Sequence, residues 1–326
     1  VMVIALLTIL ILGTTAAGGI GAVIDNARDI PGFLSFIGIA TPQTDSEGVQ
    51  IAVNGVAQFG EAGKYGFLTI ISTLSWGLGY FGVPQVLLRF MAIRKEEELK
   101  KSRRIAIVWC VISLFAAVSI GVIGRALFPA EASLATASGA ENVFVVLSQH
   151  LLPPVLAGVI MAGILAATIS SSDSYLLIAA SAFSKNIYEG ILKKGKADDK
   201  KVMNVSRIVL LLIALLGLVI AWDEDSVIFT LVSFAWAGFG ATFGPVMLFS
   251  LFWKRINRAG AIAGMLSGGI SVFVWKNLLS PMGGVWGIYE LFPAFIISCI
   301  FIVVVSLCTK EPDKEIQKEF DIAAGK

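Results

Sequence analysis

The residues best suited to do chemistry lie inside an apolar stretch, G-I-L-A-A-T-I-S-S-S-D-S-Y-L-L, from Gly163 to Leu177. At helical spacing, the carbonyl of Ala167 and the hydroxyls of Ser170 and Ser171 stand at i, i+3 and i+4, on one helix face. Neutral oxygens suit a hard monovalent cation, and three from one helix leave the other ligands to another segment. This pattern indicates a sodium site. The alternative is a serine-rich packing seam, in which each hydroxyl bonds to a carbonyl of its own helix.

Asp173 lies in the same stretch, about 18 Å from Lys185 at 1.5 Å per residue. A carboxylate at the centre of a membrane helix costs about 2.5 to 3.5 kcal/mol, so we expect it to have a partner or a function. It would support a cation directly, order the serines, or pair with a polar group on a neighbouring helix. These three roles stay open.

A second group of candidate residues lies in the segment W-G-L-G-Y-F-G-V-P, from Trp76 to Pro84. Its three glycines remove side chains and its proline removes a backbone donor, so a helix should break there. Secondary transporters build substrate sites from such broken helices. Trp76 and Tyr80 are four residues apart and would share a face, offering flat apolar surface with an N–H and an O–H to a small zwitterion. The alternative is a proline kink with two packing aromatics.

These segments belong to a chain that is 56% hydrophobic and only 15% charged, with the charges gathered between apolar runs. Such a composition is typical of a polytopic, all-α membrane protein in a lipid bilayer. We expect one transmembrane domain over residues 1–309 and a charged tail over 310–326. About eight apolar spans are expected, at residues 1–24, 65–93, 105–127, 153–185, 202–222, 226–253, 259–278 and 285–309.

Charge alternates from loop to loop along these spans. The cation-rich parts are residues 94–104, 185–201, 254–258 and the tail, whereas the intervening loops are acidic or nearly neutral and include Asp223-Glu224-Asp225. The positive-inside rule then places both ends of the chain in the cytoplasm. The chain begins without a methionine or a basic leader, so we expect that its beginning is missing.

Several classes of function are disfavoured. Cys110, Cys299 and Cys308 lack metal-ligand spacing, and the one histidine, His150, cannot form a zinc site or catalytic dyad alone. An intramembrane serine hydrolase needs a base, and no lysine or histidine lies at depth beside the serines. We therefore expect neither an enzyme nor a nucleic-acid partner. A membrane sensor remains an alternative, although it would have a longer soluble extension than this tail.

Four blocks taken together resemble the sodium:solute symporter family: S-W-G-L-G-Y-F-G-V-P-Q, A-A-T-I-S-S-S-D-S-Y-L-L, L-V-S-F-A-W-A-G-F-G-A-T-F-G-P-V-M-L-F-S-L-F-W-K-R and G-A-I-A-G-M. The resemblance implies two five-helix inverted repeats plus peripheral helices. The chain would then hold the last helix of the first repeat, the second repeat at about 65–253 and two peripheral helices at about 259–309. The earlier helices of the same protein would be its missing partner.

The resemblance, closest to the family's proline carriers, also implies a function for each candidate residue. Ala167, Ser170 and Ser171 would be sodium ligands. Trp76 and Tyr80 would line the proline site, and Gly79 and Pro84 would shape the break. The implied function is sodium-coupled uptake of L-proline by alternating access at the plasma membrane, with another amino acid or pantothenate as alternative solutes. The 326 residues alone are expected neither to bind sodium tightly nor to transport.

Overall fold

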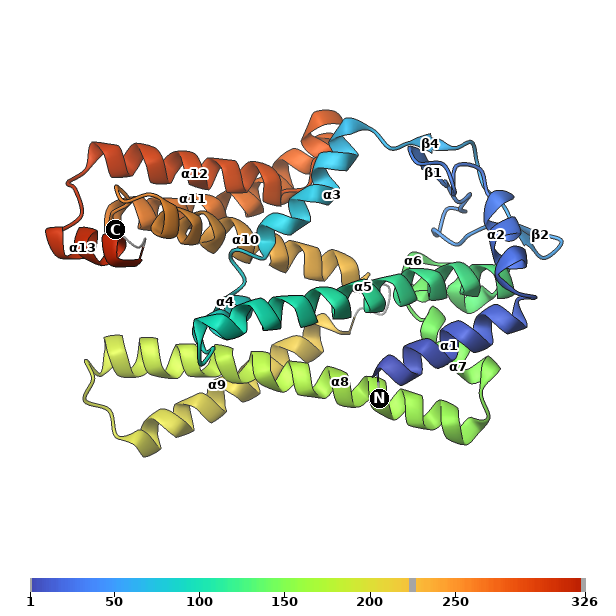
Figure 1. The fold of residues 1–326 in the computed structure, drawn as a ribbon, viewed down its shortest axis with the longest axis horizontal. Coiled ribbons are helices and arrows are strands. Elements are labelled where there is room, and N and C mark those ends of the chain that lie inside the picture. The colour runs from blue at the N-terminus through green and yellow to red at the C-terminus, as the bar shows by residue number, and fades with distance from the viewer. Residues whose placement is uncertain (1, 223–226, 324–326) are drawn as a thin grey trace. The chain divides into compact units, whose positions relative to one another are not determined.

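The computed structural model of this chain describes residues 2–222 and 227–323, so the acidic triplet Asp223-Glu224-Asp225 lies outside the described residues. Helices dominate, and the strands are two residues long (Figure 1). The chain divides into two compact units. Unit 1 holds residues 1–35, 40–62 and 105–227, and unit 2 holds residues 36–39, 63–104 and 228–326.

Unit 1 is built mainly from helices. They are α1 (Met2–Ala16), α2 (Ile20–Arg28), most of α5 (Glu96–Leu127), η1 (Ala132–Leu134), α6 (Ala137–Ala140), α7 (Val143–Leu151), α8 (Pro154–Ser181), the π-helix η2 (Ala182–Leu192) and α9 (Asp199–Ile220). A small hairpin pairs β2 (Ala52–Val53) with β3 (Val56–Ala57). An apolar core forms among α1, α2, α5, α7 and the start of α8, and Ile9, Ile120, Ile123 and Leu147 are among its most buried residues.

Unit 2 is a helical bundle in which α11 and α12 lie side by side (Figure 1). Its elements are β1 (Gly38–Ile39), β4 (Gly63–Lys64), α3 (Phe67–Gly79), α4 (Pro84–Met91), the start of α5, α10 (Ile228–Phe252), α11 (Arg258–Val274), η3 (Trp275–Leu279), η4 (Ser280–Met282), η5 (Gly284–Gly287), α12 (Leu291–Cys308) and α13 (Lys314–Ala323). Gly264 of α11 leaves room for Ile302 of α12, and Gly268 leaves room for the main chain of α10 at Ala241, because a Cβ at either glycine would overlap those atoms. Helix α3 packs on α10 and α12.

The number of membrane-spanning helices can be compared with the expected eight. Within the described residues, six helices are long and apolar enough to cross a membrane, and the number is seven if the pair α1 and α2, bent by 76°, counts as one span. The remaining expected span, residues 65–93, is divided between the shorter helices α3 and α4. The chain is a multi-pass, all-α membrane protein, as expected.

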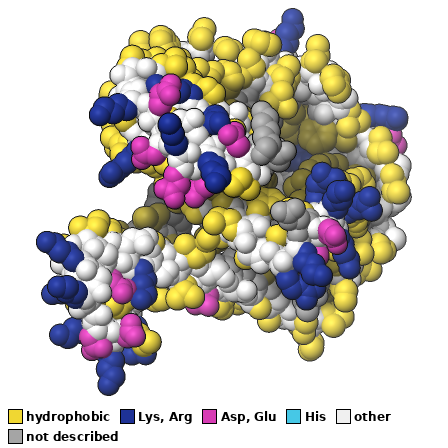
Figure 2. Space-filling model, turned by 60° about the vertical axis from the view of Figure 1, so that its left-hand side comes forward, with side chains coloured by type: hydrophobic (Ala, Val, Ile, Leu, Met, Phe, Trp, Pro, Cys, Tyr) yellow, Lys and Arg dark blue, Asp and Glu magenta, His cyan; other side chains and the backbone are white. Residues whose placement is uncertain are grey.

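The surface fits a lipid environment. None of the residues in the apolar window of α9 is buried within the chain, and many large apolar side chains elsewhere are exposed. On the face drawn in Figure 2, Lys and Arg side chains gather in clusters, and hydrophobic side chains cover much of the rest. Exposed apolar helix faces of this extent are stable against acyl chains but not against water.

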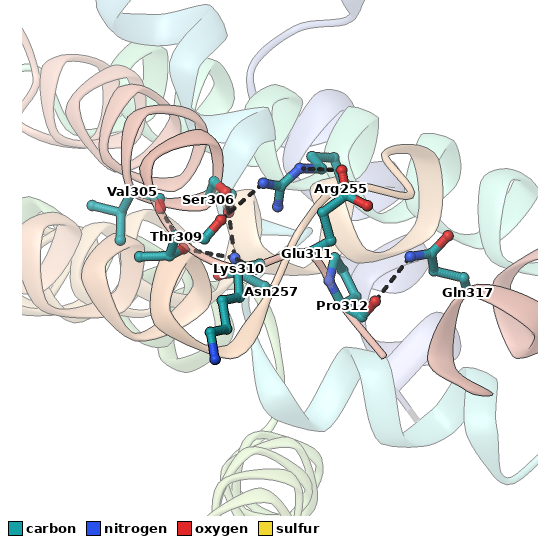
Figure 3. Close-up of polar contacts among 9 residues, drawn as sticks. All are labelled: Arg255, Asn257, Val305, Ser306, Thr309, Lys310, Glu311, Pro312 and Gln317. Carbon is teal, nitrogen blue, oxygen red and sulfur yellow. Dashed lines mark hydrogen bonds and ion pairs between the residues drawn. The ribbon is translucent and has the colours of Figure 1, made fainter. Parts of the chain in front are cut away.

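The C-terminal tail is tied to the turn between α10 and α11. Arg255 donates a hydrogen bond to the carbonyl of Thr309 at 2.9 Å, and Asn257 donates to the carbonyl of Lys310 at 2.7 Å (Figure 3). Lys254 forms an ion pair with Asp321 of α13 at 2.6 Å. These contacts hold α13, and the segment before it, against the turn between α10 and α11 within unit 2.

Candidate functional site

Helix α8 presents the three predicted sodium ligands. It runs without interruption from Pro154 to Ser181, so Ala167, Ser170 and Ser171 take the i, i+3 and i+4 positions of one face. Ala167 is half-buried, and both serines are exposed. The backbone carbonyl of Ala167 has a second lone pair beyond the one that accepts the helical hydrogen bond. The face thus offers one carbonyl and two hydroxyls.

The hydroxyls on α8 fall into two classes. Thr168 donates from Oγ1 to the carbonyl of Ile164, and Ser174 donates from Oγ to the carbonyl of Ser170, each at 3.0 Å. Among the residues that the structure describes, the hydroxyls of Ser170, Ser171 and the adjacent Ser172 form no hydrogen bond. The packing-seam interpretation therefore fits Thr168 and Ser174. It does not fit the two predicted ligands, whose oxygens stay available.

Asp173 is exposed on the same helix, one turn beyond Ser170. Within residues 2–222 and 227–323 its carboxylate has no ion pair or hydrogen bond. The role of pairing with a neighbouring helix thus has no support from the described side chains. Asp173 and Ser170 stand at i+3 and i, so they are neighbours on the surface of α8.

The predicted helix break is present between α3 and α4. Helix α3 ends at Gly79 and α4 begins at Pro84, which takes the first helical position. Val83 before the proline is extended, with φ −76° and ψ 113°. The turn between the helices is closed by a hydrogen bond from the Gly82 amide to the Gly79 carbonyl at 3.0 Å. Gly79 and Pro84 therefore delimit the break, as the sequence predicted.

Trp76 and Tyr80 lie in what we call the aromatic cluster, together with Phe229, Trp236 and Tyr289, all of unit 2. The Trp76 ring stacks on Phe229, Trp236 and Tyr289, with centroids 5.2, 5.7 and 5.9 Å away. Tyr80 meets Trp236 edge-on at 4.8 Å. Trp76 and Tyr80 thus share a face, as predicted, because both contact Trp236. Stacked pairs of this kind contribute about 0.5 to 1.5 kcal/mol each beyond their buried area.

Polar contacts fix the orientation of the cluster. The Trp236 indole Nε1 donates to the main-chain carbonyl of Trp76 at 3.0 Å. The Tyr289 hydroxyl donates to the carbonyl of Ser233 at 2.6 Å, and the main-chain amide of Tyr289 donates to Ser72 Oγ at 3.0 Å. Burial, with a smaller contribution from the charge of Glu290, raises the pKa of the Tyr289 hydroxyl above its ordinary 10.0, so it remains a donor at neutral pH.

Close approach explains the glycine at position 79. A Cβ added to Gly79 would lie 1.9 Å from Trp236 Nε1, so no side chain fits between α3 and α10 there. Gly82 is similarly enclosed, with a Cβ meeting the Phe239 carbonyl at 2.4 Å. The role of Gly79 is therefore to let the indole of Trp236 reach the end of α3.

The two aromatics differ in how much surface they present. Trp76 is half-buried, with three aromatic partners, whereas Tyr80 is 53% exposed. Tyr80 is thus the member of the pair that can offer a ring edge and a hydroxyl to a solute. Sequence reasoning missed Trp236, Phe229 and Tyr289. Trp236 stands in the quoted motif F-A-W-A-G-F-G, but its spacing shows no link to Trp76.

Comparison with known proteins adds an independent finding. The model of a family described as the sodium:solute symporter family matches residues 1–268. Among curated relatives, the chain is 43% identical over 256 residues to the "Sodium/proline symporter" of Escherichia coli (strain K12) and 40% identical over 260 residues to that of Staphylococcus aureus. Each match covers 78% of this chain and 50% of the relative. A protein of the same name from Haemophilus influenzae is 41% identical over 258 residues, covering 78% of this chain and 51% of the relative.

The chain spans about half the length of the curated relatives it matches. The family match nevertheless includes every site residue predicted from the sequence, from Trp76 to Asp173, whereas Tyr289 of the aromatic cluster lies beyond it. Since the family model covers well over half of the chain, this chain belongs to the sodium:solute symporter family.

Proposed function

We propose that this chain contributes to a sodium-coupled importer of L-proline, carrying its second five-helix repeat at about 65–253 and two peripheral helices at about 259–309. The observation that carries the proposal is the pair of uncommitted hydroxyls, Ser170 and Ser171, beside the carbonyl of Ala167 on one face of α8. The names of the relatives, each a sodium/proline symporter, support both the ion and the solute.

Sodium would bind the three oxygens of α8. One helix supplies only part of a shell for a hard cation, which commonly has six or more oxygen ligands. The remaining oxygens come from a segment outside this face, so binding ties α8 to that segment. Asp173 lies one turn away and lowers the electrostatic cost of the positive ion.

Proline would be recognised at the broken helix. Tyr80 offers exposed aromatic surface and a hydroxyl, and Trp76 supports it through their shared contact with Trp236. Helix α3 ends at Gly79 and α4 begins at Pro84, which leaves main-chain groups between them for a zwitterion. The pyrrolidine ring of proline matches a flat apolar surface.

Coupling follows from the charge of the ion. Sodium binding from outside favours the state that accepts the solute, and release to a low-sodium cytoplasm reverses the bias. One elementary charge moving through 100 mV supplies about 2.3 kcal/mol, which is roughly fifty-fold accumulation. By the positive-inside rule, the basic loops at 94–104, 185–201 and 254–258 support the proposal that both ends of the chain are cytoplasmic, and we propose the plasma membrane as the location.

The deciding experiment is uptake of labelled L-proline into cells that lack their own proline carriers. The full-length gene product that contains this chain is expressed, and uptake is measured with sodium and with choline replacing it. We expect uptake that needs sodium and is competed by unlabelled proline. If another amino acid or pantothenate competes instead, the result would support the proposed sodium site but refute proline as the solute. Uptake indifferent to sodium would refute the proposal.

A further inference from the structure

A cavity of about 680 Å³ lies in unit 1, and none of the candidate residues lines it. Its walls come from the end of α5, the segment around β2 and β3, and the segment from Phe128 to Val143. Apolar side chains predominate, among them Phe33, Phe59, Val118, Val122, Phe128 and Leu134. Small-molecule sites commonly have this size and this mostly apolar lining, with a few polar groups that fix orientation.

One cation lines the cavity. Arg125 stands in the last turn of α5, and its Nη1 donates to Gln50 Oε1 at 3.1 Å and to the carbonyl of Pro129 at 3.3 Å. The guanidinium carbon lies 4.8 Å from the centroid of the Phe59 ring. These contacts hold the plane of the guanidinium in place without neutralising its charge, because all three partners are uncharged.

Only some of the hydrogen-bond donors of the Arg125 guanidinium have acceptors. Among the described residues, its Nε and Nη2 atoms form no hydrogen bond. Glu131 is the other charged residue of the lining that the structure describes. It is exposed and accepts a hydrogen bond from Ser133 at 3.1 Å, and it forms no ion pair with Arg125. A fixed guanidinium with two unused donors is suited to a bidentate carboxylate.

We propose that this cavity is a binding site for an organic carboxylate with an apolar body. The carboxylate pairs with Nε and Nη2 of Arg125, and the apolar body packs against Phe59 and Val122. The proposed sodium and proline sites involve other residues, so the carboxylate site can be tested independently of the proposed transport function.

The test is equilibrium binding of radiolabelled octanoate to the full-length protein in nanodiscs, with empty nanodiscs subtracted to remove partition into lipid. We expect saturable binding that unlabelled octanoate displaces and that octylammonium, with the same tail and the opposite charge, does not. Arg125→Gln should weaken binding by about tenfold or more, the usual effect of losing a charge-assisted contact. Ala135→Leu, which adds volume to the lining, should weaken binding with Arg125 intact.

Controls separate ligand contact from a structural role. Gln50→Ala removes the acceptor at Nη1 but keeps the guanidinium, so it should bind octanoate within about threefold of the wild type. Thermal unfolding shows whether each variant is folded. If the Arg125→Gln protein does not fold, the result for the Ala135→Leu protein decides the test. The proposal is overturned if wild-type binding is not saturable, if octylammonium competes equally, or if a folded Arg125→Gln or Ala135→Leu protein binds like the wild type. A folded Gln50→Ala protein that loses as much as Arg125→Gln would also overturn direct contact.

Discussion

The indole Nε1 of Trp236 donates a hydrogen bond to the main-chain carbonyl of Trp76 across 3.0 Å. Trp76 stands in the last turn of α3, where the carbonyls lack amide partners further along the helix. A side chain of α10 thus satisfies an acceptor that the break in the helix would otherwise leave free. The interaction joins the two motifs, S-W-G-L-G-Y and F-A-W-A-G-F, that sequence reasoning treated separately.

Trp236→Phe tests this hydrogen bond while keeping an aromatic ring against Trp76. Leaving the Trp76 carbonyl without its partner should cost about 1 to 3 kcal/mol, seen as a lower midpoint of thermal unfolding in detergent. Trp275→Phe is the matched control, because its indole also donates to a carbonyl, that of Trp286 at 3.1 Å, but in an exposed setting outside the cluster. Equal effects of the two substitutions would argue against a special role for Trp236.

Gly79→Ala tests the close approach of α3 and α10. The new methyl group would overlap Trp236 Nε1, so the indole must move, and we expect a loss of about 1 to 3 kcal/mol together with reduced proline uptake. Gly77→Ala is the control, since nothing lies within 4 Å of its added Cβ. That change should leave uptake intact and stabilise α3 by about 0.5 to 1 kcal/mol. Normal uptake and stability in Gly79→Ala would contradict the geometry.

Ser171→Ala tests the ion site on α8. Losing one neutral ligand should raise the sodium concentration for half-maximal proline uptake by about tenfold, with little change in the amount of protein in the membrane. Ser174→Ala removes a hydroxyl that already bonds to the Ser170 carbonyl, so it should leave the sodium dependence unchanged. If the Ser171→Ala and Ser174→Ala proteins need the same sodium concentration for half-maximal uptake, Ser171 is not a sodium ligand.

Much of the fold follows from apolar length and helix breakers. The helices of the third to eighth expected spans, and the break before Pro84, agree with the prediction because each depends on local composition. The family resemblance is confirmed, and since the family consists of sodium-coupled transporters, the chain is not an enzyme, as expected. The bend between α1 and α2 was not predicted, although Gly18 and Gly19, both with positive φ, stand at it.

The aromatic cluster was predicted only in part, for a physical reason. Trp76 and Tyr80 belong to one helix, so their spacing alone places them on one face. Trp236 and Tyr289 are 160 and 213 residues from Trp76, and their contacts with it arise from the packing of α3 on α10 and α12. The same holds for Arg125 and Gln50, which lie 75 residues apart.

Tyr289 should remain protonated well into the alkaline range. Burial raises the pKa of its hydroxyl above the ordinary 10.0, and the nearby charge of Glu290 adds to the shift. A group whose folded pKa is raised stabilises the protein fully below its unfolded pKa, and loses that contribution as pH rises through the folded pKa. The stability advantage of wild type over Tyr289→Phe should therefore be constant up to about pH 10 and decline only above it. Phenolate absorbance at 295 nm provides the direct measurement. The difference in phenolate absorbance between the wild type and Tyr289→Phe should stay near zero around pH 10, where unperturbed tyrosines ionise. A titration of one tyrosine centred near pH 10 in that difference would show that the Tyr289 hydroxyl is free and does not donate to the Ser233 carbonyl.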